Sequence, residues 1–231
     1  QQELKRSVIS TVSHQLKTPL TSLQMSIYLL LEEKCGALTP EQVDLVMAMR
    51  DDSDRLTGII GDLLDLNKVS RSGSLQTEAH APNELLMLAK ERFLAECQEH
   101  SIRLETECDP LAPVLPVALN RINYAFDNLI GNAIRFTPPG GTILLTAKRS
   151  GAAVEFSVSD TGRGMSDEVA SHIFEPFYRG PGQDAASGVG LGLSIVREIV
   201  TSHGGSIHVR SKENAGTVFS FTLPVTEGEM S

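Results

Sequence analysis

The chain is short of basic residues, and this shortage excludes several classes of partner. Its 231 residues include 20 Lys and Arg against 29 Asp and Glu, which gives a net charge of −9. Proteins that bind nucleic acid or anionic membranes in general need the opposite balance, so no nucleic-acid partner is expected. A nucleotide such as ATP is not excluded, because a local pocket matters more for it than the total charge.

Cysteine and long apolar runs are also scarce. The three cysteines, Cys35, Cys97 and Cys108, are odd in number and far apart, which argues against a disulfide framework or a zinc site and favours a reducing, cytoplasmic compartment. No apolar run reaches the roughly 18 residues of a membrane span, and no signal peptide is recognisable. The chain begins Gln-Gln-Glu without an initiator methionine, so we expect it to be a piece of a longer protein.

The first 70 residues have the periodicity of two amphipathic helices joined by a short turn. In residues 1 to about 34 the apolar positions recur in steps of three and four: Leu4, Val8, Val12, Leu16, Leu20, Leu23, Ile27 and Leu30. Gly36 is expected as the C′ residue that ends this helix. Thr39-Pro40-Glu41-Gln42 has the N-cap, the first-turn proline and the reciprocal Gln that start the next helix. The second helix carries an apolar seam: Leu45, Met49, Leu56, Ile59, Leu63 and Leu66.

Two such helices form an antiparallel α-helical hairpin that buries only part of its apolar stripe. Pairing with a second copy into a dimeric four-helix bundle would complete the burial, so we expect a homodimer through residues 1–70. Periodicity alone fits a plain coiled-coil spacer equally well.

His14 lies on the polar side of the first predicted helix. It is two residues from both Val12 and Leu16, which places it about 200° round the helix from the buried stripe. Pro19 has no N–H to donate to the carbonyl of Gln15, so the helix should bend beside this histidine. An exposed imidazole on a locally loosened helix is a candidate nucleophile.

A change in composition at residues 71–82, rich in Ser, Gly and Thr, indicates a linker to a second domain at 83–231. In that domain helices are expected at 83–100, 118–135 and 191–203, and strands at 102–106, 114–115, 143–147, 154–159, 206–210 and 218–223. This order fits an α/β two-layer sandwich with a mixed sheet better than a doubly wound fold. Residues 167–189 contain turn formers and little periodicity, and we expect them to form a mobile lid.

A pair of asparagines in this domain lies on one face of a predicted helix. Asn128 and Asn132 are four residues apart, so their amide oxygens project together and can help to hold Mg²⁺, which keeps waters and phosphate oxygens as its other ligands. Arg135, one turn further on, can meet a phosphate. The ordinary alternative for such a pair is an exposed polar face.

Two glycine-containing segments add to the asparagine pair. Asp160-Thr161-Gly162-Arg163-Gly164-Met165 follows a predicted strand, where a carboxylate can accept a hydrogen bond from an adenine amino group while the glycines let the backbone pass close by. Gly188-Val189-Gly190-Leu191-Gly192-Leu193 precedes a predicted helix, whose N-terminal amides attract phosphate. Its spacing fits neither the dinucleotide fingerprint nor the P-loop. Each segment taken singly is also compatible with an ordinary turn.

In this order, and with His14 upstream, these segments resemble the catalytic core of a bacterial two-component sensor histidine kinase. The resemblance covers residues 4 to 225 and implies a dimerisation and histidine-phosphotransfer hairpin followed by a Bergerat-type ATP-binding domain. The boxes of the family are matched by Ser13–Thr21, Asn128–Thr137, Asp160–Met165, Phe174–Arg179, Gly188–Leu193 and Gly216–Phe219.

The resemblance implies ATP and Mg²⁺ as cofactors, His14 as phospho-acceptor and a response-regulator receiver domain as partner. It places Mg²⁺ at Asn132 and Asn128, adenine at Asp160 and Thr217, and phosphates near Arg135 and Arg179. The boxes add Phe136, Gly162, Gly164 and Leu191 to the nucleotide-binding residues, while Gly188, Gly190 and Gly192 would shape the return of the lid. It further implies the cytoplasmic portion of an inner-membrane sensor, with membrane contact only through a region absent from this chain.

Gln15 departs from the family pattern, in which Glu or Asp follows the histidine and serves as its base. A carboxamide can orient the imidazole but cannot take its proton, so slow autophosphorylation is expected. Thr18 shares the exposed face of His14, and a polar residue there helps similar proteins to hydrolyse the phospho-aspartate of the regulator. A dominant phosphatase activity is therefore one expectation.

Two other functions remain open from the sequence. One is an ATPase that shares the Bergerat pocket but carries out no phosphotransfer to histidine. The other is an ATP-binding scaffold that presents its hairpin to a partner without chemistry.

Overall fold

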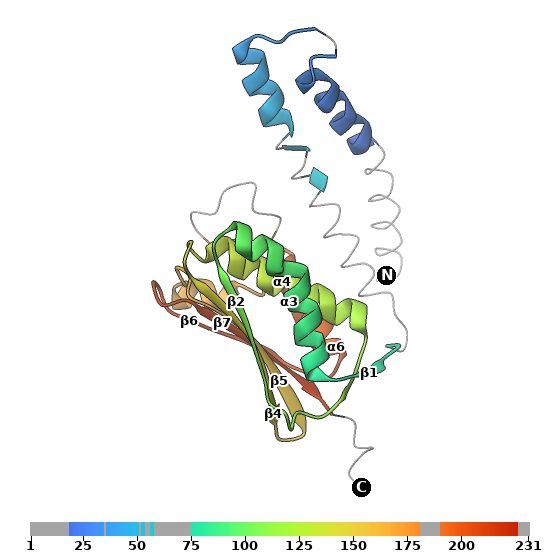
Figure 1. Ribbon diagram of the computed structural model, residues 1–231, viewed down its shortest axis with the longest axis vertical. Helices are drawn as coiled ribbons and strands as arrows, with labels where there is room; N and C mark the ends of the chain where they lie inside the picture. The colour runs from blue at the N-terminus through green and yellow to red at the C-terminus, as the bar shows by residue number, and fades with distance from the viewer. Residues whose placement is uncertain are drawn as a thin grey trace. The chain divides into compact units, whose positions relative to one another are not determined.

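The structure is a computed structural model that describes residues 19–34, 36–50, 52–53, 56–57, 75–180 and 190–225. The chain divides into two compact units. The hairpin unit consists of Gln1–Arg71 and Phe177–Gly192, and the α/β unit consists of Ser72–Pro176 and Leu193–Ser231. Figure 1 colours both units along the chain.

The described part of the hairpin has helical residues at 19–31, 40–50, 52–53 and 56–57. The first helix ends earlier than its glycine predicts. Lys34 N–H donates to Leu29 C=O and Glu33 N–H to Leu30 C=O, both at 3.0 Å, while Glu33 has a φ of 53°. These two bonds define a Schellman motif in which Glu33, not Gly36, is the left-handed C′ residue. The expected role of Gly36 was wrong.

The capping box predicted for the second helix is confirmed. Thr39 Oγ1 accepts from Gln42 N–H at 3.3 Å, and Gln42 Oε1 accepts from Thr39 N–H at 2.9 Å. This reciprocal pair satisfies two N–H groups that the first turn of a helix leaves without partners. Local sequence alone therefore fixes where the second helix begins.

The two helices face each other through positions seven residues apart. Leu20 and Ile27 are buried on the first, and Val46 and Ser53 on the second. The apolar seam predicted for the second helix is not the face that packs on the first helix, because Leu45 is 66% exposed within the single chain. Met49 and Leu56 of that seam are likewise exposed. Among the described helices, none combines the length and apolar content needed to cross a membrane.

The α/β unit contains three main helices, one short helix and seven strands among its described residues. Their bounds are β1 (Glu78–His80), α3 (Pro82–Glu99), β2 (Arg103–Cys108), β3 (Leu115–Val117), α4 (Leu119–Phe136), β4 (Thr142–Ser150), β5 (Ala153–Asp160), α5 (Asp167–His172), α6 (Gly192–Ser202), β6 (Ile207–Ser211) and β7 (Thr217–Pro224). Each of the predicted helices and strands is present, with ends shifted by a few residues.

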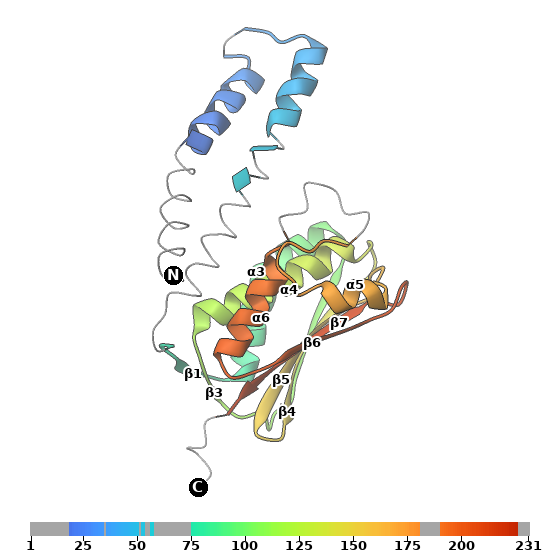
Figure 2. The same cartoon turned by 180° about the vertical axis from the view of Figure 1, so that it is seen from behind.

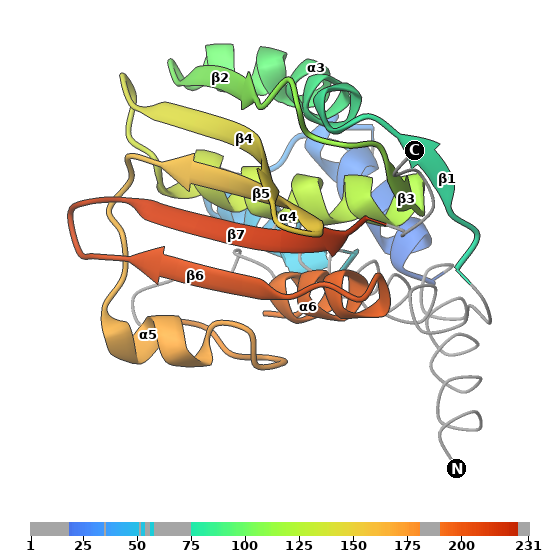
Figure 3. The ribbon, with the colours of Figure 1, turned by 90° about the horizontal axis from the view of Figure 1, so that it is seen from below.

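The five-stranded sheet has the order β2-β4-β5-β7-β6, with β2 and β4 parallel and the other neighbours antiparallel. In Figure 3, α3, α4 and α6 lie on the same side of this sheet. The predicted hairpin followed by an α/β domain with a mixed sheet is thus confirmed. The core lies between the two layers, where the rings of Phe126, Phe156 and Phe221 meet with centroids 5.3 to 5.8 Å apart.

Two segments expected to lack regular structure contain short elements. Within the predicted linker 71–82, β1 pairs antiparallel with β3. Within the predicted lid 167–189, α5 forms from residue 167 because Ser166 Oγ accepts from Val169 N–H at 3.4 Å as its N-cap. Figure 2 shows α5 beside β6. A three-residue strand and a six-residue helix are too short to produce a recognisable periodicity, so sequence reasoning missed both.

Candidate functional site

Asp160 is the buried carboxylate at the end of β5. Along this strand Val154, Phe156 and Val158 alternate inward, and the same period of two carries Asp160 to the next inward position. Only 8% of its surface is exposed. The hydrophobic alternation of the strand therefore determines that this charge points into the unit.

The Asp160 carboxylate is held through one oxygen. Its Oδ1 accepts from Gly162 N–H at 2.8 Å and from Thr217 N–H at 3.3 Å. Among the described residues no group bonds to Oδ2, which remains an acceptor. Burial raises the pKa of the Asp160 carboxyl above its ordinary value, and the bonds from Gly162 and Thr217 oppose this shift. An exocyclic amino group is a donor that fits such an oxygen.

Two glycines let the loop after β5 pass close to neighbouring backbone. A Cβ on Gly162 would collide with the carbonyl oxygen of Phe136 at the end of α4. Gly164 has a φ of 64°, and a Cβ there would collide with the carbonyl oxygen of Lys212. Both positions require glycine, which explains the Gly-x-Gly spacing after Asp160.

Thr217 lies opposite Asp160 in the β5–β7 pairing and is 5% exposed. Its Oγ1 is 3.0 Å from Ser211 Oγ. Ser211 Oγ also donates to Gly216 C=O at 2.9 Å and accepts from Met165 N–H at 2.9 Å. Ser211 thus ties the loop after β5 to the start of β7. Sequence reasoning missed it, and only the β6–β7 register could have revealed it.

The asparagine pair lies on α4, as the four-residue spacing predicts, and both residues are half-buried. Asn128 Nδ2 donates to Tyr124 C=O at 3.2 Å, which leaves its Oδ1 for another partner. In the described part of the chain no group of three or more His, Cys, Asp or Glu residues gathers as a metal site. A site built on amide oxygens fits Mg²⁺ that retains waters and phosphate oxygens, rather than a metal caged by protein ligands alone.

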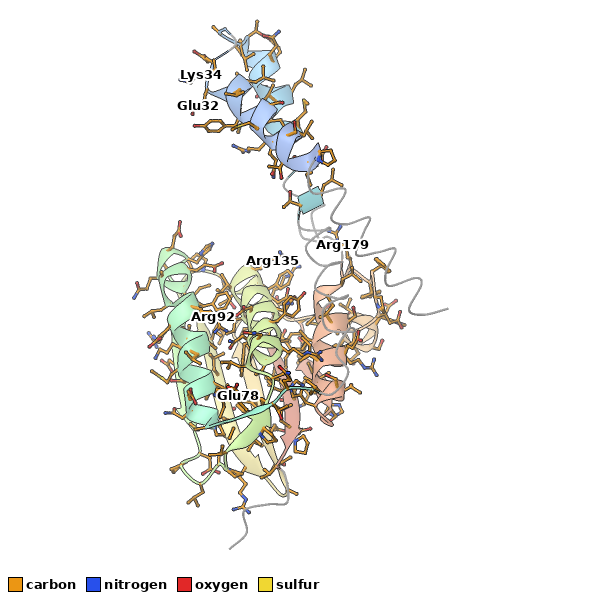
Figure 4. All side chains as sticks on the ribbon, turned by 90° about the vertical axis from the view of Figure 1, so that its right-hand side faces the viewer. Glu32, Lys34, Glu78, Arg92, Arg135 and Arg179 are labelled. Carbon is orange, nitrogen blue, oxygen red and sulfur yellow. The ribbon has the colours of Figure 1, made fainter. Side chains whose placement is uncertain are left out.

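Arg92 of α3 fixes the position of α4. Its Nε and Nη2 donate to Asp127 Oδ1 at 3.0 and 2.7 Å, and its Nη1 donates to Asn123 Oδ1 at 3.2 Å. Figure 4 labels Arg92 between the two helices. Because Asp127 directly precedes Asn128, this contact from α3 also limits the rotation of α4 and of its asparagine face.

Arg135 is exposed at the C-terminal end of α4, where Figure 4 labels it, and Phe136 follows it. The Arg163 guanidinium carbon lies 4.6 Å from the centroid of the Phe136 ring, and that of Arg135 lies 6.0 Å from it. The three residues line a hollow of about 580 Å³. Arg163 belongs to the Asp160–Met165 motif, and sequence reasoning missed it as a site residue because its position beside Phe136 depends on a tertiary contact.

Several predicted site residues are not placed together with this group. His14, Gln15, Thr18 and Gly188 lie outside the described residues. A further set, Arg179, Gly190, Leu191 and Gly192, belongs to the hairpin unit. Within that unit Phe177 N–H donates to Gly190 C=O at 2.9 Å, so residues on either side of the segment 178–189 are held together.

Known families match both units. Residues 4–71 match the His Kinase A (phospho-acceptor) domain, and residues 118–227 match the family described as histidine kinase-, DNA gyrase B-, and HSP90-like ATPase. The catalytic domain of the histidine kinase ThkA is 32% identical with a TM-score of 0.57, over 64% of this chain and 95% of that domain. The chain belongs to the sensor histidine kinases.

This histidine kinase core is similar over nearly its whole length to longer sensor proteins. The sensor protein DivL of Caulobacter vibrioides is 34% identical over 98% of this chain and 29% of its own length. The alginate biosynthesis sensor protein KinB of Pseudomonas aeruginosa is 33% identical over 97% of this chain and 38% of its own length. The histidine kinase core thus spans well under half of the length of these relatives.

A solved structure of a full-length relative supports the same family. ShkA in complex with AMPPNP is 30% identical with a TM-score of 0.75, over 94% of this chain and 45% of that one. The match extends across both the hairpin unit and the α/β unit of the histidine kinase core.

Proposed function

We propose that this histidine kinase core binds ATP in the α/β unit, transfers the γ-phosphoryl group to His14 and passes it to an aspartate of a response-regulator receiver domain. The observation that carries the proposal is the buried Asp160 carboxylate, which is fixed at Oδ1 and open at Oδ2. The complex of ShkA with AMPPNP supports a nucleotide, and a complex of ThkA with the response regulator TrrA, 25% identical with a TM-score of 0.68, supports the partner.

In this proposal Asp160 Oδ2 accepts a hydrogen bond from the adenine amino group, and Thr217 lies beside it. Gly162 and Gly164 allow the backbone to approach the ring, and Phe136 adds an apolar surface. Arg135 and Arg179 neutralise phosphate charge. Gly188, Gly190 and Gly192 shape the return of the predicted lid, and Leu191 adds to the nucleotide-binding residues. Phosphoryl transfer depends on positioning and charge neutralisation more than on covalent work by the protein, and these are roles that such residues can fill.

Asn132 and Asn128 would hold Mg²⁺ through their amide oxygens. When bound, the ion would supply positive charge that neutralises the phosphates. The contribution of the chain is to keep the asparagine face of α4 in place through the contact of Arg92 with Asp127.

His14 would attack as the neutral imidazole, because only an unprotonated ring nitrogen can act as the nucleophile. Gln15 can orient the ring by accepting a hydrogen bond but cannot take the proton. We therefore propose a slow forward reaction, with Thr18 positioning a water for dephosphorylation of the regulator. This phosphatase activity is a second function, and the replacement of the usual acidic residue by Gln15 is what favours it.

We further propose that the hairpin pairs with a second copy. Leu45, Met49 and Leu56 form a stripe that the first helix of the same chain leaves exposed, next to the buried face of Val46 and Ser53. A second hairpin covering this stripe would complete a four-helix bundle. In the complete protein we propose that this core is the cytoplasmic portion of an inner-membrane sensor.

Incubation with γ-labelled ATP and Mg²⁺, followed by mapping of the modified residue, tests the proposal. We expect acid-labile label on His14, absent from a His14→Ala variant that still binds nucleotide. ATP hydrolysis without labelled protein would instead indicate an ATPase of the Bergerat type. Nucleotide binding with neither label nor hydrolysis, together with signalling that survives His14→Ala, would indicate a scaffold.

A further inference from the structure

Ser211, the last residue of β6, makes three contacts through a single hydroxyl group. Its Oγ lies 2.9 Å from Gly216 C=O, 2.9 Å from the backbone nitrogen of Met165 and 3.0 Å from Thr217 Oγ1. A serine hydroxyl has one proton and two lone pairs. The three contacts therefore use all of its capacity for hydrogen bonds.

The chemistry of the three partners fixes the direction of each bond. Gly216 C=O can only accept, so the proton of Ser211 lies on this bond. Met165 N–H can only donate, and it takes the first lone pair. The second lone pair faces Thr217 Oγ1, and two oxygens 3.0 Å apart attract each other only when a proton lies between them. Thr217 must supply that proton.

This direction determines what the Thr217 side chain can offer to a ligand. Its one proton is held by Ser211, so its oxygen keeps only lone pairs. Asp160, which is opposite Thr217 in the β5–β7 pairing, is in the same condition, because its ionised carboxylate can only accept. In the part of the chain that the structure describes, this pair of buried side chains thus presents acceptors and no donor.

We propose that Ser211 is a positioning residue that sets base specificity: it holds the Thr217 hydroxyl as an acceptor, and so makes the contact at Asp160 and Thr217 select a 6-amino over a 6-oxo purine. The inference rests on the proposed function. The amino group of adenine has two protons to donate, whereas the 6-oxo group of hypoxanthine is an acceptor and would face only other acceptors. Acceptors that meet each other in a buried site lose the bonds that they made to water, which lowers affinity.

Calorimetry on the full chain with Mg²⁺ and the non-hydrolysable analogues of ATP and of ITP, whose base is hypoxanthine, tests the inference. Ser211→Ala frees the Thr217 hydroxyl to turn its proton towards a 6-oxo group. We expect the affinity for the ATP analogue, divided by that for the ITP analogue, to fall about tenfold, since one buried hydrogen bond accounts for a change of that size. Ser211→Thr keeps the hydroxyl and should keep this affinity ratio.

Two controls separate base selection from a structural role. Ser206→Ala removes another serine–threonine contact, that of Ser206 Oγ with Thr222 Oγ1 at 3.2 Å next to the opposite end of β6, and should leave the affinity ratio unchanged. Thr217→Val removes the hydroxyl that Ser211 holds, so adding Ser211→Ala to it should change the ratio no further. An unchanged ratio in Ser211→Ala, with both analogues weakened equally, would overturn the inference, because Ser211 would then only hold the loop after β5.

NMR on the unliganded chain tests the direction of the bond without nucleotide. We expect the Thr217 hydroxyl proton to be protected from exchange with water, and to lose this protection in Ser211→Ala. A Thr217 hydroxyl proton that exchanges equally fast in both proteins would overturn the inference. If the unmodified chain binds neither analogue, the proposed function fails and the base selection fails with it, while the protected proton still shows how Ser211 holds Thr217. The two failures are therefore distinguishable.

Discussion

The two units of this chain differ in how they bury apolar side chains. In the α/β unit the rings of Phe126, Phe156 and Phe221 are fully buried between sheet and helices. In the described hairpin Leu20, Ile27 and Val46 are buried, but many large apolar residues are exposed: Leu23, Met25, Tyr28, Leu29, Val43, Leu45, Met47, Met49 and Leu56. The α/β unit completes its own core, whereas a single hairpin leaves most of its apolar surface for another partner.

The largest expected effect is on the rate of autophosphorylation, and it comes from a residue of the hairpin. If the proposed reaction is correct, Gln15→Glu supplies a proton acceptor beside His14 and should accelerate autophosphorylation, since general-base catalysis contributes about 10² to 10⁴ in rate. The measurement is the initial rate of labelling from γ-labelled ATP, with Gln15→Ala as a control that adds no base. An unchanged rate in Gln15→Glu would show that proton removal does not limit the reaction.

In the α/β unit, a substitution in the core should have the largest effect on the free energy of unfolding. Phe156→Ala removes a ring that contacts Phe126 and Phe221, and should lower the free energy of unfolding by about 3–5 kcal/mol. Urea denaturation measures the loss, and Leu111→Ala, at a side chain that is 76% exposed, is the control. A loss below about 1 kcal/mol would mean that the core is less tightly packed than its ring contacts indicate.

The exposed seam of the hairpin should control assembly without affecting the other unit. Leu45→Gln with Met49→Gln replaces two side chains that one chain leaves exposed, so the double variant should be monomeric in sedimentation velocity while the α/β unit keeps its melting temperature. Met87→Gln, at an exposed position of α3, is the control. A double variant that sediments as the unmodified chain does would contradict pairing through this stripe.

Within the α/β unit, Asp160→Asn should separate binding from stability. The side-chain oxygen of the asparagine can still accept from Gly162 and Thr217. An N–H₂ group replaces the free oxygen and would face the adenine amino group donor to donor, so ATP affinity should fall about 10- to 100-fold.

The same variant tests the effect of the charge on stability. Burial raises the pKa of Asp160, so the folded state holds a proton that the unfolded state releases, and stability decreases as the pH rises from the unfolded pKa through the folded one. The melting temperature of the uncharged variant at pH 7 should therefore be no lower than that of the unmodified chain. A lower melting temperature would mean that the carboxylate has a structural role.

A smaller effect is expected from His203 at the end of α6. Its Nδ1 bonds to Ile199 C=O at 2.8 Å, and its Nε2 accepts from Ala118 N–H at 3.1 Å, at the N-terminus of α4. Burial lowers the pKa of His203 from its ordinary 6.5, the backbone bond to Ile199 opposes this shift, and the charge of Arg121 adds to it. The unfolded state therefore takes up a proton first, and the stability from the neutral ring is complete above pH 6.5 and is lost as the pH falls below it.

The melting temperature of the α/β unit measured from pH 7.5 to pH 5 tests this linkage, with His203→Gln as the control. The glutamine can accept from Ala118 but does not titrate, so the fall in melting temperature at low pH should be smaller in the variant. Parallel curves for the two proteins would assign the pH dependence to other groups.

Local rules account for the features that were predicted correctly. Thr39 and Gln42 cap a helix because both partners lie within one turn, and Asp160 stands at the end of a strand because the period of two continues to it from Val154. The four-residue spacing of Asn128 and Asn132 places both on one face of α4. In each case the deciding distance is a few residues along the chain.

Long-range contacts account for what was missed. The face of Val46 and Ser53, the bond network of Ser211 and the stacking of Arg163 on Phe136 join segments that are far apart in sequence. The early end of the first helix is an exception, because it arises from local bonds of Glu33 and Lys34 to Leu30 and Leu29 that do not depend on a glycine.

The sequence by itself determined the order of the main helices and strands, the capping box of the second helix and the spacing of the residues that carry chemistry, because backbone bonding and side-chain period act over a few residues. Only the tertiary structure decided which oxygen of Asp160 is open, which stripe of the second helix faces the first, and that Arg163, Arg135 and Phe136 share one hollow. These depend on the pairing of β5 with β7 and on the contact of α4 with the loop after β5. Such pairings are selected by the packing of the whole unit rather than by neighbouring residues.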